Sequence, residues 1–194
     1  QNPDDWTVSI TRFDIPTSSI PLMIFPNPTT FYITLTYAGV DYQAPVQYVA
    51  SAPAPLSSSF YVFDIHNFLT SINDAFLVAY NLLNVAFPGT VPAAPFMIYD
   101  APTHLFSLIA DATYGSVPVD IYFSSSLYLK FQNFNFFFYG YDLPSKKDIN
   151  LIVKNYGNNV YTGTLLEMQQ SNQDLGQLTS LERIIFNTNT IPVS

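Results

Sequence analysis

The sequence predicts an all-β fold, an antiparallel sandwich or barrel interrupted by one long helix. Period-two segments rich in β-branched and aromatic residues recur along the 194-residue chain. The 15 prolines fall almost wholly between these segments, where a missing N–H and a fixed φ end strands. Many short strands at roughly even spacing favour an antiparallel arrangement. We expect residues 1–194 to form a single domain, as part of a longer polypeptide.

The first two predicted strands show the clearest alternation. In residues 6–13 and 31–37, large apolar side chains alternate with threonine, serine or tyrosine. Alternation of this kind puts one face of each strand toward a core. Shorter candidate strands follow in chain order at PVQYV, SFYVFD, PFMIYD, HLFSLIAD, VDIYFS, NFFFYGY, INLIVKN, VYTGTLL and LERIIFNT.

One segment departs from the strand pattern. From Ile65 to Phe87, apolar residues recur at spacings of three and four, which predicts an amphipathic helix of about six turns. Asp64 is a suitable N-cap, and Pro88 with Gly89 supplies the stop. A second, shorter helix or 3₁₀ turn is expected over residues 125–131. The apolar face of the long helix consists of Ile65, Phe68, Leu69, Ile72, Phe76, Ala79, Tyr80 and Leu83.

The composition argues against nucleic-acid binding and against a membrane span. The chain carries six lysines and arginines and a net charge of −8, and only Lys146 and Lys147 are adjacent. A phosphate-binding face needs clustered cations, so direct nucleic-acid binding is not expected. The long helix is interrupted by histidine, asparagine and aspartate, too polar for hydrocarbon. Charged residues make up 10% of the chain, and a neutral polar surface suits burial against other subunits.

No recognisable catalytic, cofactor or metal motif is found. The chain lacks cysteine and has two histidines, His66 at the start of the helix and His104 in a loop. His104 could share a site with Asp111, although we interpret both histidines as structural. The remaining aspartates border turns, where this residue commonly caps the backbone. We therefore expect no enzyme activity, no cofactor and no metal ion.

Residues 131–141, FQNFNFFFYGY, concentrate seven aromatic side chains. We expect Phe136 and Phe138 to face the core. Alternation then places Phe137 and Tyr139 on an outer face that the helix, a long loop or a neighbouring molecule must cover. The alternatives are packing inside the chain, a subunit interface and a stacking platform for a ligand. The candidate interface residues are Phe134, Phe137, Tyr139 and Tyr141.

Several blocks of sequence, taken in order, resemble a known family. They are WTVSITRFDIPTSSIPLMIFPNP, FYVFDIHNFLTSINDAFLVAYNLL, PFMIYDAPTHLFSLIAD, VDIYFSSSLYLKFQNF and LERIIFNTNTIPVS. Together they resemble the minor capsid, or penton, proteins of virophages and polinton-like small double-stranded DNA viruses. The most specific parts are IIFNTNTIPV and the aromatic strand that leads directly into the helix.

This resemblance implies a single jelly roll of two antiparallel four-stranded sheets, with the amphipathic helix inserted. It also implies a viral structural protein of the virion capsid. Five copies would form a homopentamer at a capsid vertex and contact the major capsid protein. The alternative is a lectin-like, carbohydrate-binding β-sandwich, in which tyrosine and tryptophan stack on sugar rings and Asn or Asp side chains bind hydroxyls.

Overall fold

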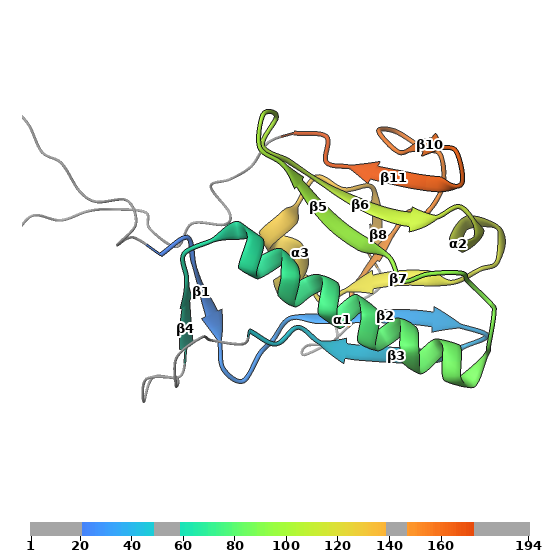
Figure 1. The fold of residues 1–194 in the computed structure, drawn as a ribbon, viewed down its shortest axis with the longest axis horizontal. Helices are drawn as coiled ribbons and strands as arrows, with labels where there is room; N and C mark the ends of the chain where they lie inside the picture. The colour runs from blue at the N-terminus through green and yellow to red at the C-terminus, as the bar shows by residue number, and fades with distance from the viewer. Residues whose placement is uncertain (1–20, 49–58, 139–146, 173–194) are drawn as a thin grey trace, which may run out of the picture.

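A computed structural model describes residues 21–48, 59–138 and 147–172, and Figure 1 shows their arrangement. Within these ranges the chain is mostly β, with eleven strands and three helices. The helices are α1 (Ile65–Ala86), α2 (Thr113–Ser116) and α3 (Ser125–Phe131). The strands are β1 (Met23–Pro26), β2 (Tyr32–Tyr37), β3 (Val40–Pro45), β4 (Ser59–Val62), β5 (Phe96–Asp100), β6 (Leu105–Asp111), β7 (Asp120–Phe123), β8 (Phe136–Phe138), β9 (Ile149–Leu151), β10 (Val160–Thr162) and β11 (Leu165–Gln169).

These strands form three antiparallel sheets. Their orders are β1-β4, β10-β11-β6-β5 and β3-β2-β7-β9-β8. The expected pair of four-stranded sheets is therefore not confirmed, since the described sheets have two, four and five strands. Pro26 ends β1 and Pro28 lies between β1 and β2, where the missing N–H groups prevent one continuous strand, so β1 pairs with β4 in a separate ribbon.

Most of the strand predictions within the described ranges are confirmed, and two are corrected. The strand expected at residues 45–49 is wrong, because β3 lies earlier and pairs with β2 through a turn at Ala38 and Gly39. The strand expected at residues 160–166 is a hairpin, since Gly163 has a φ of 65° and turns the chain between β10 and β11. The predicted strands at residues 6–13 and 181–188 lie outside the described residues.

The long helix is confirmed at both ends. Asp64 caps α1 by accepting a hydrogen bond from the His66 backbone N–H at 2.9 Å. Six of the eight residues on the predicted face are buried, and α1 packs on β2, β3, β4 and β5. Figure 1 shows the helix lying across the side of the molecule, between β3 of one sheet and β5 of another. The shorter helix expected at residues 125–131 is α3, whereas α2 was not predicted.

Aromatic rings join the helices to the sheets at the centre of the core. Phe131 of α3 stacks on Phe68 of α1, with ring centroids 5.5 Å apart and planes inclined by 5°. The same ring meets Phe106 of β6 edge-on at 4.9 Å. Because Phe131 and Phe68 are buried almost completely, these contacts connect α1, α3 and the four-stranded sheet in one core.

Candidate interaction surface

The aromatic run of residues 131–141 divides at Asn135. Before it, Phe131 and Phe134 point into the core, and Phe134 is 4% exposed. After it, β8 forms an edge of the five-stranded sheet and pairs with β9, with Phe137 opposite Asn150. The side chains of Phe136, Phe137 and Phe138 are 41%, 58% and 47% exposed.

The expectation that Phe136 and Phe138 face the core is therefore wrong. Phe131, Phe134 and Tyr128 are already buried next to this end of the sheet. The Phe136 ring instead packs against Tyr128, with centroids 4.7 Å apart. Side chains along a strand alternate between the two faces of the sheet. Because β8 is a three-residue strand at the sheet edge, outside the layer that these buried rings fill, its side chains stay accessible on both faces.

The four candidate interface residues thus have different environments. Phe134 is buried inside the subunit, and Phe137 is the most exposed residue of β8. Tyr139 and Tyr141 lie outside the described residues. A role of this group at an interface stays a prediction, and of the two described members Phe137 is the one that a partner could reach directly.

An open groove of about 780 Å³ lies beside β8 and β9. Its lining combines aromatic rings with amide groups and a lysine. The lining includes Asn135, Phe136, Phe137, Asn150, Lys154 and Tyr156. A surface of this kind can bury apolar area against a partner and also offer hydrogen bonds at its margin.

Two side-chain amides, the buried one of Asn159 and the half-buried one of Asn135, hold the loop that follows β9 next to this groove. Asn159 is almost fully buried, and its Nδ2 donates to the carbonyl oxygens of Ile152 at 2.7 Å and Lys154 at 3.0 Å. Asn135 donates from Nδ2 to the Tyr156 carbonyl oxygen at 3.0 Å. Gly157 lies against this amide, because a Cβ added there would be 2.6 Å from the Asn135 nitrogen. These contacts therefore fix the position of the loop that lines one side of the groove.

Gln170 links the four-stranded sheet to the end of α3. Its Oε1 accepts a hydrogen bond from the Phe106 N–H at 2.9 Å. Its Nε2 donates to the carbonyl oxygen of Phe131 and, at 3.0 Å, to that of Gln132. Carbonyl groups at the end of a helix have no intrahelical partner, so this buried amide satisfies them. Gln170 thereby helps to set the point from which the chain leaves α3 toward β8.

Asp148 supports the other end of α3. Its buried carboxylate accepts hydrogen bonds from the backbone N–H and the hydroxyl of Ser125, at 3.0 and 2.6 Å. Tyr128, in the middle of the helix, donates its hydroxyl to the Phe134 carbonyl oxygen at 3.1 Å. Burial raises the pKa of Tyr128 to about 12, so its phenol stays a donor even near pH 10, where an ordinary tyrosine ionises. Burial also lowers the pKa of Lys130.

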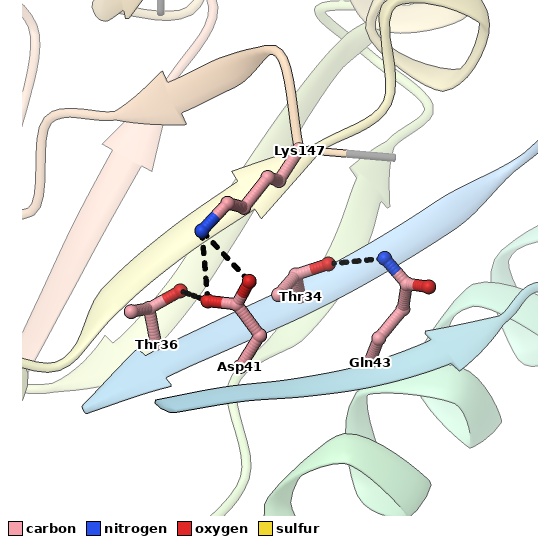
Figure 2. A network of polar contacts seen from close by, with 5 residues as sticks. All are labelled: Thr34, Thr36, Asp41, Gln43 and Lys147. Carbon is pink, nitrogen blue, oxygen red and sulfur yellow. Dashed lines mark hydrogen bonds and ion pairs between the residues drawn. The ribbon is translucent and has the colours of Figure 1, made fainter. Parts of the chain in front are cut away.

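A polar network covers part of the five-stranded sheet (Figure 2). Lys147 Nζ lies 2.7 Å from Asp41 Oδ2, and the Thr36 hydroxyl donates to Asp41 Oδ1 at 2.7 Å. On the same pair of strands, Gln43 Nε2 donates to Thr34 Oγ1 at 3.1 Å. Asp41 thus forms an ion pair besides bordering a turn, and one member of the adjacent lysine pair is engaged within the chain.

The histidines do not form a reactive cluster. His66 lies in the first turn of α1, and His104 contacts the Tyr99 hydroxyl through Nδ1 at 2.7 Å. His104 precedes β6 and Asp111 ends it, so the suggested His104–Asp111 site is not formed. Over residues 21–48, 59–138 and 147–172, no group of three or more His, Asp or Glu side chains is placed to hold a metal ion. No helix in these ranges has the length and hydropathy that a membrane crossing needs.

The chain is mostly β, with an exposed apolar sheet edge and few charges, and exposed apolar patches of this kind mark interaction sites. Comparison with known proteins identifies the family. The whole chain, residues 1–194, matches the family described as Sputnik minor capsid protein V18/19, and the chain belongs to this family. It is therefore a virophage-type structural protein of the virion capsid, as the sequence resemblance predicted.

Individual relatives agree with this assignment. The chain is 28% identical over 109 residues to structural protein V19 of Sputnik virophage, covering 50% of each sequence. It is similar to a chain in the cryo-EM structure of the Sputnik virophage, with a TM-score of 0.65, 31% identity and coverage of 81% of this chain and 53% of that one. The mavirus penton protein shares the fold at a TM-score of 0.55 and 14% identity, covering 82% of this chain and 46% of the other. The chain thus spans about half the length of these relatives.

Proposed function

We propose that this chain is the single jelly-roll domain of a penton subunit and has a structural role without catalysis. Five copies associate around a capsid vertex, and the ring contacts the major capsid protein. The observation that carries the proposal is the exposed phenylalanine edge of β8 in a chain of a capsid family. An exposed apolar edge strand of this kind promotes aggregation of a monomer, whereas in an assembly a neighbouring subunit buries it.

Two further features support assembly as the function. The fold is similar to that of the mavirus penton protein. Charged residues are scarce, and neutral polar groups cost less to desolvate than ions when subunits meet. The six scattered basic residues argue against direct contact with the genome.

The mass of the purified chain in solution tests this proposal. Light scattering coupled to gel filtration should give a mass five times that of one chain, and negative-stain images should show rings. Added major capsid protein should co-sediment with the rings in particles. A chain that stays monomeric at every concentration and joins no particle would refute the proposal.

The groove beside β8 is the observation that favours the alternative function, carbohydrate binding. Its Phe137 and Tyr156 rings are exposed, and the Asn135, Asn150 and Lys154 side chains contribute to its lining. Aromatic faces with adjacent amides suit sugar rings and their hydroxyls. Binding to a glycan array that is lost in Phe137→Ser, by a chain that forms no rings, would favour this function instead.

A further inference from the structure

Helix α1 has a second apolar surface, on the side away from the core. Val78, Leu82 and Val85 recur at spacings of four and three, so they share one face of the helix. All three are exposed, and Val85 reaches 82%. We refer to these residues as the α1 stripe. A helix that is apolar on two sides commonly packs against two partners, and among the described residues the core covers only one of these sides.

A second cluster of exposed apolar side chains lies around β8 and the start of β10. It consists of Phe136, Phe137, Tyr156 and Val160, which we refer to as the β8–β10 patch. The hydrogen bond from Asn135 to the Tyr156 carbonyl oxygen connects β8 with the following loop. The bond from Asn159 to the Ile152 carbonyl oxygen connects the start of β10 with the end of β9. Phe136, Phe137 and Tyr156 line the same groove, and Val160 follows Asn159, whose hydrogen bond holds the start of β10 beside the end of β9.

The α1 stripe and the β8–β10 patch lie at opposite edges of the two large sheets. The five-stranded sheet runs from β3 to β8, and the four-stranded sheet runs from β5 to β10. Helix α1 packs on β3 and β5, the two edge strands farthest from β8 and β10 (Figure 1). A closed ring is compatible with this arrangement, because each subunit of a ring meets its two neighbours through two different surfaces.

We propose that the α1 stripe of one copy packs against the β8–β10 patch of the next copy; this inference rests on the proposed ring. One charged side chain on each surface can pair across this contact. Asp74, one turn before Val78, is the only acidic residue of α1, and the helix has no lysine or arginine. On the other side, the groove beside β8 is lined by Lys154, which we propose as the partner of Asp74, and also by Asp120.

Paired variants test the contact. Leu82→Ser/Val85→Ser removes most of the α1 stripe, and Phe137→Ser/Tyr156→Ser removes the centre of the β8–β10 patch. We expect each double variant to stay folded by circular dichroism and to weaken association at least tenfold, giving monomers by light scattering. Tyr61→Ser is the control, because Tyr61 is an aromatic residue of similar exposure on β4, outside both surfaces.

Mixing the two double variants is the decisive measurement. Each retains the surface that the other lacks, so one intact contact forms and the mixture should give a 1:1 heterodimer and no rings. Rings that survive in both variants, or a mixture that stays monomeric, would overturn this contact and leave the proposed ring standing. A wild-type chain that is itself monomeric would instead refute the ring and, with it, the contact.

Discussion

Replacing Gln170 by leucine tests whether one buried amide holds α3 to the four-stranded sheet. The substitution keeps a side chain of similar length and removes the amide. The Phe106 N–H and the carbonyl oxygens of Phe131 and Gln132 then lose their partner. The backbone hydrogen bond from the Gln170 N–H to the Phe106 carbonyl oxygen, at 3.1 Å, is unaffected.

The expected loss of stability follows from counting these groups. A buried donor or acceptor left without a partner costs about 1–3 kcal/mol. Three such groups would cost about 3–9 kcal/mol, and the added apolar burial of leucine returns about 1–2 kcal/mol. Because carbonyl groups at a helix end can find other donors after small shifts, we expect a net loss of about 3–5 kcal/mol. That is a large part of the about 5–15 kcal/mol that stabilises a typical domain.

Urea unfolding followed by far-UV circular dichroism measures this loss. The measurement is best made in the Leu82→Ser/Val85→Ser background, because association would otherwise add to the apparent stability. Gln43→Leu is the control, since Gln43 makes one hydrogen bond, to Thr34, at a half-buried position and should cost less than about 1 kcal/mol. A loss in Gln170→Leu no larger than that of the control would refute the reasoning.

Three further substitutions probe the surroundings of the site. Gly157→Ala should destabilise the chain by clearly more than Gly163→Ala. Both glycines have positive φ, but only at Gly157 would the added Cβ lie 2.6 Å from a side-chain nitrogen, that of Asn135. Thermal unfolding of the two variants measures the difference. The raised pKa of Tyr128 predicts stability that is complete below pH 10 and declines toward pH 12 as the phenol ionises, and Tyr128→Phe should make that decline smaller. Asp41→Asn should cost at most about 1 kcal/mol and less at 1 M salt, because the Lys147 ion pair is solvent-exposed; a larger, salt-independent loss would show that the pair is structural.

The strongest local signals in the sequence correspond to elements of the structure. The apolar spacing of residues 65–87, with Asp64 before it and Pro88 after it, predicted α1 almost to the residue. Such a helix is specified locally, since its cap, its stop and its periodicity all lie within the segment. The hairpin turn at Gly39 carried a weaker signal and was missed, so β3 was expected too late in the chain.

The aromatic run shows the limit of local patterns. Alternation predicts that neighbouring side chains of a strand point to opposite faces, but it does not say whether the strand lies at the centre or at the edge of a sheet. Phe131 and Phe134 already occupy the core, so β8 pairs at the edge and its three phenylalanine side chains stay exposed. The apolar face on the outside of α1 was likewise overlooked, because one apolar face is enough to predict an amphipathic helix.

The sequence by itself therefore determined the mostly β character, the long helix with its cap, the shortage of charge and the capsid family. It did so because periodicity, composition and ordered sequence blocks depend on residues close together in the chain. Only the tertiary structure decided which aromatic side chains are buried and which edge of each sheet is covered by α1. Those outcomes depend on competition for a single core among segments far apart in the chain, such as Phe68, Phe106 and Phe131.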